Sequence, residues 1–306
     1  MSEFQMGPIG VLLTLCALSF LLNGTFLIVI CKSWKLVKGK RITYHVANLA
    51  IADGIAGASG FCKFMTIVEA EKMTTLISAF DTIAWMAVLT SFLAVCLMAI
   101  ERALCIKKPH TWKQILPLKN ILLIIAGSWV LAISMSILFH YYPLEMKFVF
   151  LVIFFIPITV TSVVYINIYM KFRTSNEECD EAEDTSAATI EERRNKMMQR
   201  KVGTFVLILV LILIISVSPT YITLFVQVSC ELFQLNCTFM ETVQKVQVYF
   251  YILAIMNHVV NPIFYAWRIS LYRQAFWQAF GRATDSEVPE TYVSTINVIS
   301  YSVSLP

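Results

Sequence analysis

Residues 246–267 read VQVYFYILAIMNHVVNPIFYAW, an apolar stretch of membrane-spanning length that carries Asn261-Pro-Ile-Phe-Tyr265 near its C-terminal end. A proline inside a helix removes a backbone hydrogen-bond donor and usually kinks the helix. Asn261 and Tyr265 also place polar side chains where apolar ones would be less costly in a bilayer. This polar break in a membrane helix predicts a part of the molecule that moves.

The composition of the chain is that of a membrane protein. Hydrophobic residues make up 58% and charged residues 14% of its 306 residues, whereas soluble domains carry about 25% charged residues. These apolar segments are too long and too uniform for the strands of a barrel. A helix crosses the hydrocarbon core with about 20 apolar residues, and seven such windows occupy Ile9–Ile30, Tyr44–Val68, Leu76–Cys105, Ile121–Tyr141, Phe148–Tyr169, Val202–Val228 and Val246–Trp267. The sequence therefore predicts an all-α bundle of seven transmembrane helices.

The distribution of Lys and Arg predicts the orientation of this bundle. With seven spans the two termini lie on opposite sides, and the loops that share a side with the C-terminus hold most of the basic residues. The opposite side holds only Lys72, Lys147 and Lys245. The positive-inside rule then places the N-terminus outside the cell and the C-terminus in the cytosol. The net charge of +4 reflects basic loops beside a membrane and requires no nucleic-acid partner.

The segments outside the windows are also informative. The first window is long and ends in a basic cluster, which favours a true span over a cleaved signal peptide. The link between the fifth and sixth windows ends in Glu, Arg and Lys residues at i,i+4 spacing, which predicts a cytosolic extension of the sixth helix. Residues 268–280 place Ile269, Tyr272, Phe276 and Phe280 at three- and four-residue steps. This pattern predicts a short amphipathic eighth helix on the inner leaflet. We expect one transmembrane domain at 1–280 and a disordered cytoplasmic tail at 281–306.

Polar and proline residues recur in a fixed order along the seven windows. They are Asn23, Asn48-Leu-Ala-Ile-Ala-Asp53, Glu101-Arg102-Ala103, Trp129, Pro157 with Tyr165, Pro219 and Asn261-Pro262-Ile-Phe-Tyr265. With these motifs the chain resembles the rhodopsin-like, or class A, G-protein-coupled receptors over essentially its whole length. The resemblance implies a plasma-membrane receptor, not an enzyme, that passes an extracellular ligand signal to heterotrimeric G proteins. It also implies that receptor kinases and arrestin could act on the serines and threonines of the tail.

The resemblance assigns roles in activation to several of these residues. It implies that Arg102 lies under the G-protein site, where Glu101 holds it until the sixth helix moves. Tyr165 and Tyr265 match the tyrosines that pack inward in the active form, and Pro219 and Pro262 match the helix-kinking prolines of the sixth and seventh spans. The chain departs from the family in having Ala103, Gln199 and Val217 where an aromatic, an acidic residue and a tryptophan are usual. Without an acidic partner for Arg102 on the sixth helix, we expect some ligand-independent signalling.

Asp53 is an ionisable residue near the middle of the second window. Such a residue is costly in a bilayer unless it faces the interior of the bundle and finds a partner. By resemblance, Asp53, Ser91, Asn257 and Asn261 match the internal sodium pocket of these receptors, and a carboxylate with neutral oxygens suits a small hard cation. The alternative is a polar network that holds the helices together. No other cofactor is expected.

A ligand site is expected at the outer mouth of the bundle. By resemblance its lining comprises Asp81, Trp85, Phe154, Tyr221, Leu224 and Tyr251, an apolar surface with a few polar groups. A lipid, a peptide end or a small aromatic molecule would fit such a surface; the alternative for each residue is plain helix packing. Ala84 stands where amine receptors have an aspartate, and Ile255 where retinal proteins have their lysine. These two positions argue against an amine ligand and against retinal.

The cysteines suggest a subgroup of the family. Ile77 replaces the cysteine that most members use for a bridge to the second outer loop. Cys230 and Cys237 instead lie close together in the third outer loop, which predicts a local disulfide, and Asn236 opens a glycosylation sequon. This pattern is similar to that of the melanocortin receptors and their adenosine, lysophospholipid and cannabinoid relatives. Because Ile77 and Lys63 replace two melanocortin acidic residues, we expect Lys63 to pair with Asp81 or Glu69, and no calcium site.

A second class of function remains to be weighed. A seven-span transporter or channel could line an ion path with Asp53, Asn257, Asn261 and Lys63. Transporters usually contain internal repeats with discontinuous helices in matched halves, and this sequence has no such repeat. The receptor hypothesis is therefore preferred.

Overall fold

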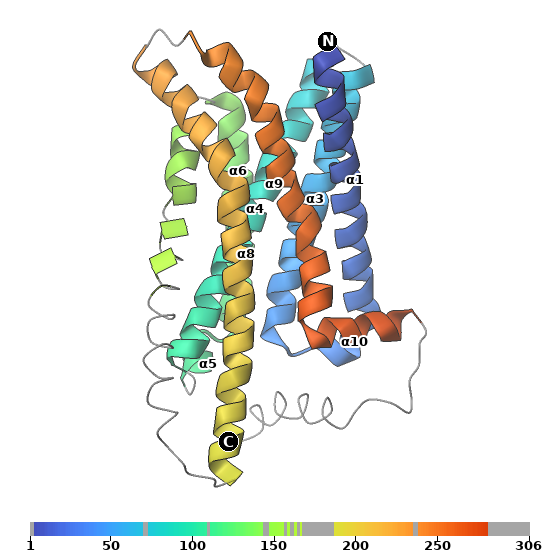
Figure 1. Cartoon of the computed structure of the whole chain (residues 1–306), viewed down its shortest axis with the longest axis vertical. Coiled ribbons are helices and arrows are strands. Elements are labelled where there is room, and N and C mark those ends of the chain that lie inside the picture. The colour runs from blue at the N-terminus through green and yellow to red at the C-terminus, as the bar shows by residue number, and fades with distance from the viewer. Residues whose placement is uncertain are drawn as a thin grey trace.

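The computed structural model describes residues 3–69, 73–108, 111–142, 147–155, 158–159, 162–163, 166, 187–234 and 238–280. All regular secondary structure in these ranges is helical. The long helices run side by side as a bundle (Figure 1). They are α1 (Glu3–Lys32), α3 (Arg41–Glu69), α4 (Thr74–Lys107), α6 (Leu118–Tyr141), α8 (Ala187–Leu232) and α9 (Met240–Arg268).

Each of these six long helices is apolar enough to cross a membrane, which confirms six of the seven predicted spans. The fifth predicted window, Phe148–Tyr169, is described in part, and its described residues, at 148–155, 158–159, 162–163 and 166, are helical. α8 begins at Ala187, so the predicted helical extension of the sixth span is confirmed, whereas its place in the cytosol stays a prediction.

Three short helices lie at the end of the bundle opposite to the N-terminus (Figure 1). They are α2 (Trp34–Val37), α5 (Trp112–Ile115) and α10 (Ser270–Ala279). We call this end of the bundle the inner end and the other the outer end, because the basic loops predict that the inner end faces the cytosol. α10 turns across the end of the bundle after α9, at the end opposite to the N-terminus (Figure 1). It is the predicted eighth helix.

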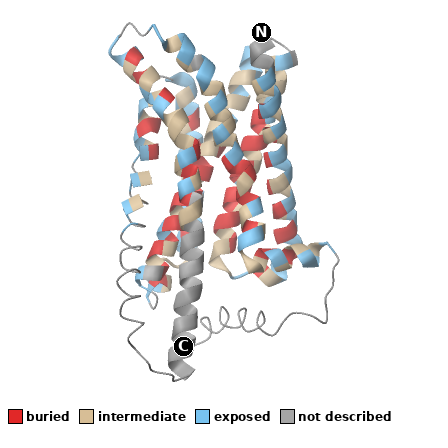
Figure 2. Ribbon diagram, in the orientation of Figure 1, coloured by how far each residue is buried: buried red, intermediate tan, exposed pale blue. Residues whose placement is uncertain are grey.

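Burial separates an apolar exterior from an interior that includes polar groups. Buried residues cluster where the helices face one another, and exposed residues lie on the outer sides (Figure 2). Large apolar side chains such as Val130 and Ile215 are 65% and 67% exposed, as expected for surfaces that contact lipid. Asn23, Asp53, Glu101 and Asn261 are instead buried. Their polar side chains therefore need partners inside the bundle.

α10 is fixed to the bundle by an aromatic cluster. The Phe26 ring of α1 lies 5.7 Å from the Tyr265 ring of α9 and 5.3 Å from the Tyr272 ring of α10. The Ser33 hydroxyl donates to the Ala275 carbonyl at 2.9 Å. Tyr272 is fully buried, and this burial raises the pKa of its phenol. The neutral hydroxyl donates to Thr43 Oγ1 at 3.3 Å.

Candidate functional site

The centre of the bundle is organised around the buried carboxylate of Asp53 on α3. Its Oδ1 accepts a hydrogen bond from the Ser91 hydroxyl of α4 at 2.5 Å and lies 2.6 Å from Nδ1 of His258 on α9. Its Oδ2 accepts from the Asn261 amide of α9 at 2.7 Å. One carboxylate therefore connects three helices.

Asn23 connects α1 to the same centre, at the proline of α9. Its Nδ2 donates to the His258 carbonyl at 3.0 Å and to the Ser19 carbonyl at 2.9 Å. In an α-helix the His258 carbonyl would accept from the N–H four residues on, but that residue is Pro262, which has no N–H. Asn23 thus supplies the donor that the proline removes. The Ser19 hydroxyl also donates to the Asp53 carbonyl, at 3.0 Å.

The prediction that Asp53 faces the interior is confirmed, and the structure brings Ser91 and Asn261 to it. Asn257 is also buried, but no hydrogen bond joins its side chain to Asp53 among the described residues. His258 is instead the further α9 residue that contacts the Asp53 carboxylate. This contact was not anticipated from the sequence. The available signal was a titratable side chain inside a predicted span, which is a candidate functional group by default.

A second buried carboxylate, that of Glu101 on α4, lies at the inner end of the bundle. Its Oε2 lies 3.0 Å from a guanidinium nitrogen of Arg102 and 2.8 Å from Nε2 of His45 on α3. The Glu101 and His45 side chains are both 0% exposed, and that of Arg102 is 14% exposed. The Glu101–Arg102 pair agrees with the sequence, whereas His45 is a partner that sequence reasoning missed.

The second inner loop is attached beneath this pair by Trp112 of α5. The Arg41 guanidinium lies 4.7 Å and the Arg102 guanidinium 5.8 Å from the centre of the Trp112 ring, both within the range of cation–π attraction. Arg41 also donates to the Leu116 carbonyl at 2.5 Å. Nearby, burial and then the positive charge of Lys113 lower the pKa of Lys40. Arg41, Arg102, Lys40 and Lys113 therefore make this end of the bundle basic.

The structure describes some, but not all, of the remaining residues with predicted roles in activation. Tyr265 is fully buried against Phe26, and Pro219 and Pro262 lie inside α8 and α9. Pro157 and Tyr165 lie outside the described residues. The roles of all these residues in signalling stay predictions.

The outer half of the bundle holds the predicted ligand residues in two groups. In the polar group, Lys63 forms an ion pair with Asp81, as the sequence suggested. The Tyr251 hydroxyl accepts from Gln247, whose side-chain oxygen accepts from Gln227, each at 2.9 Å.

The second outer group is aromatic. The Trp85 ring lies 5.3 Å and the Phe154 ring 6.2 Å from the ring of Phe150. The Tyr221 hydroxyl donates to the Leu151 carbonyl at 2.9 Å, and Leu224 is half-buried on the same helix as Tyr221. Whether these residues bind a ligand stays a prediction.

The structure describes one of the two cysteines of the predicted outer-loop disulfide. Cys230 is disulfide-bonded and lies near the C-terminal end of α8 and not in the loop itself, whereas Cys16, Cys31, Cys62 and Cys105 are free thiols. Cys237 and the sequon residue Asn236 lie outside the described residues. The pairing and the glycan therefore stay predictions.

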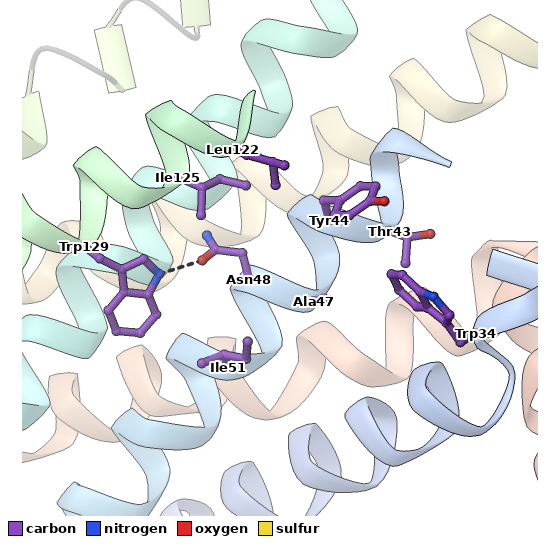
Figure 3. A pocket seen from close by; sticks show the side chains of 9 residues that line it. All are labelled: Trp34, Thr43, Tyr44, Ala47, Asn48, Ile51, Leu122, Ile125 and Trp129. Atoms are coloured by element: carbon purple, nitrogen blue, oxygen red, sulfur yellow. Dashed lines mark hydrogen bonds between the residues drawn. The ribbon is translucent and has the colours of Figure 1, made fainter. Parts of the chain in front are cut away.

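A shallow groove of about 290 Å³ lies between α3 and α6 (Figure 3). Trp129 and Asn48, two of the motif residues, lie on its wall, and the Trp129 indole donates to Asn48 Oδ1 at 2.8 Å. Because Trp129 belongs to α6 and Asn48 to α3, this hydrogen bond positions α6 against α3.

Comparison with known proteins agrees with this architecture. The chain matches the 7 transmembrane receptor (rhodopsin family) model over residues 22–148 and 144–265. It therefore belongs to the rhodopsin family of seven-transmembrane receptors. It is accordingly a multi-pass membrane protein with an all-α seven-helix bundle. It is a signalling receptor rather than an enzyme, and receptors of this family have G proteins as partners. No curated protein sequence matches the chain.

Proposed function

We propose that this receptor lies in the plasma membrane with its N-terminus outside and signals by coupling ligand binding to nucleotide exchange on a heterotrimeric G protein. The observation that carries the proposal is the buried Glu101–Arg102 pair at the basic inner mouth. Breaking a buried ion pair leaves an uncompensated charge and is strongly unfavourable. The pair is therefore suited to two discrete states, one with Arg102 held by Glu101 and one with Arg102 released toward a partner.

The Asp53 network provides the connection between the two ends of the bundle. It joins α1, α3, α4 and α9 through Ser19, Asn23, Ser91, His258 and Asn261. A ligand that displaces the outer part of α9 must strain these bonds at the Pro262 kink. In this mechanism the ligand binds one of two pre-existing arrangements more tightly and shifts the equilibrium between them.

The outer half of the bundle favours a ligand with a polar end and an apolar or aromatic body. The Lys63–Asp81 pair and the Tyr251 hydroxyl offer polar contacts, and the rings of Trp85 and Phe154 offer an aromatic surface. A peptide end, a lipid and a small aromatic molecule all have this character. Melanocortin peptides, adenosine and lysophospholipids are therefore the first ligands to test, and receptor kinases and arrestin are the expected regulators of the C-terminal tail.

The proposal is tested by nucleotide exchange on purified G-protein heterotrimers of several subtypes, with the receptor reconstituted in vesicles. The candidate ligands are added one by one. Arg102→Ala should abolish the exchange that wild type supports, because it removes the charge that Glu101 releases. Arg273→Ala removes an exposed arginine of α10 and serves as the matched control; it should retain most of the exchange.

Two results would contradict the proposal. One is wild-type receptor that leaves every heterotrimer inactive while its vesicles pass solute, which is the behaviour of a transporter or channel. The other is an Arg102→Ala variant that folds and supports exchange as well as wild type does.

A further inference from the structure

Both oxygens of the Asp53 carboxylate face hydrogen-bond donors that belong to the chain itself. Oδ1 receives the Ser91 hydroxyl at 2.5 Å and His258 Nδ1 at 2.6 Å, and Oδ2 receives the Asn261 amide at 2.7 Å. A separation of 2.6 Å between His258 Nδ1 and Asp53 Oδ1 is a hydrogen-bond distance, so the ring nitrogen and the carboxylate share one hydrogen. The carboxylate is therefore satisfied without an added ion.

A sodium ion would require these groups to present lone pairs instead of hydrogens, because hard cations take oxygen ligands. The Ser91 hydroxyl has lone pairs, and rotation of the Asn261 amide would present an oxygen. The His258 imidazole has no oxygen in any orientation, and imidazole is a ligand for transition metals rather than for hard cations. His258 is thus the residue that does not fit a sodium site.

His258 cannot easily leave this position. Its side chain is only 8% exposed, and its carbonyl is held by Asn23 at 3.0 Å. The ring and the backbone of one residue therefore join α9 to α3 and to α1. Moving the ring aside for an ion would break the contact with Asp53 inside the bundle, where unpaired polar groups are costly.

The other groups around the carboxylate supply no positive charge. Ser19 and Asn23 of α1, Ser91 of α4 and Asn261 of α9 carry neutral hydroxyl and amide groups. No Lys or Arg within the described ranges forms an ion pair with Asp53. Among the described side chains that hydrogen-bond this carboxylate, His258 is the one that offers an ion no oxygen ligand.

We propose that His258 takes the place of sodium in this receptor. Its imidazole links α9 to the Asp53 carboxylate and excludes the ion, so that the stability of the bundle does not depend on sodium. The proposal rests on the donors around Asp53 and not on the identity of the ligand or the G protein.

Thermal unfolding of the purified full-length receptor, compared in sodium chloride and potassium chloride at equal ionic strength, tests the proposal. Wild type should unfold at the same midpoint in both salts. His258→Ser replaces the ring by a small hydroxyl and opens an oxygen-lined space. This variant should unfold roughly 2–4 °C higher in sodium than in potassium, the size of shift expected when an ion binds the folded state of a protein of this size.

Two further variants make the test specific. His258→Ser combined with Asp53→Asn should lose the sodium effect, because the carboxylate that would hold the ion is gone. His140→Ser removes a histidine at the end of α6, where the ring contacts Ser78 at 3.0 Å, and should remain indifferent to sodium. His258→Asn, which keeps a larger side chain with an oxygen, replaces His258→Ser if the latter does not fold.

Wild type that is stabilised by sodium, with the effect lost in Asp53→Asn, would overturn the proposal. So would folded His258 variants that are as indifferent to sodium as wild type. Because the readout is unfolding, either result leaves the proposed G-protein coupling to be judged by nucleotide exchange alone.

Discussion

At the scale of single residues, buried polar groups of one helix find their hydrogen-bond or ion-pair partners on a neighbouring helix. Asn23 donates to the carbonyl that Pro262 leaves without an N–H donor, and Glu101 is shared between Arg102 and His45. In each case a side chain of one helix bonds to a buried polar group that would lack a sufficient partner on its own helix. Such satisfaction is obligatory, because an unpaired polar group in the bilayer costs several kcal/mol.

The hydrogen bond from Asn23 to the His258 carbonyl, which Pro262 leaves without a backbone donor, leads to a specific prediction. Asn23→Ala should lower the free energy of unfolding by about 1–3 kcal/mol, because the buried His258 carbonyl loses its partner. Pro262→Ala restores a backbone N–H to that carbonyl, so Asn23→Ala should cost less in that background. A double-mutant cycle measured by unfolding gives the coupling between the two sites.

Asn120→Ala is the control for this cycle. Asn120 is an exposed residue near the start of α6, so its loss should change the free energy of unfolding by less than about 0.5 kcal/mol. An equal cost of Asn23→Ala in both backgrounds would show that Asn23 does not act through the carbonyl freed by the proline.

At the scale of elements, the contact between α1 and α3 depends on small residues. A Cβ added at Gly57 of α3 would lie 2.7 Å from the Cys16 carbonyl oxygen and 2.7 Å from the Phe20 amide nitrogen of α1. These are backbone atoms, which cannot move aside like the end of a flexible side chain. The close approach lets Ser19 and Asn23 of α1 reach α3 and α9, so the polar network depends on this packing.

Gly57→Ala should therefore destabilise the receptor by roughly 1–3 kcal/mol, the usual cost of overpacking. It should also weaken the Asp53 network by displacing α1. Gly24→Ala is the matched control, because nothing lies within 4 Å of a Cβ added at that helical glycine. The control should be neutral or stabilising by about 0.5–1 kcal/mol. Unfolding midpoints measured side by side decide the matter, and equal midpoints for the two variants would refute a backbone contact at Gly57.

At the scale of the whole molecule, one end of the bundle is basic and carries α5 and α10, and the other carries the disulfide-bonded Cys230. This asymmetry predicts the orientation in the membrane, because loops rich in Lys and Arg remain in the cytosol. An N-terminal tag should be stained on intact cells and a C-terminal tag only after permeabilisation.

Replacing Lys107, Lys108 and Lys113 by Gln should lower the fraction of molecules with an external N-terminus. The same change at the outer Lys72, Lys147 and Lys245 is the control, and it should leave that fraction unchanged. Staining of the C-terminal tag on intact wild-type cells would contradict the orientation.

The sequence by itself was sufficient for what depends on local composition and spacing. Long apolar windows predict the helices and the amphipathic pattern after Tyr265 predicts α10, whereas the orientation indicated by the basic loops stays a prediction. The ordered motifs also identified Asp53 with Ser91 and Asn261, and Glu101 with Arg102, because a charge within a span must find a partner in the bundle.

Only the tertiary structure decided which side chains complete these pairs. His258 and His45 each lie in an apolar helix, where composition alone does not distinguish a packed residue from a partner of a carboxylate. Their contacts depend on the rotation and register of one helix against another, which in turn depend on packing at positions such as Gly57. The same is true of Trp112, whose ring meets Arg41 and Arg102 only when the second inner loop folds back beneath the bundle. A helix specifies its own face through its sequence, whereas the neighbour that meets this face is set by the assembly of the whole bundle.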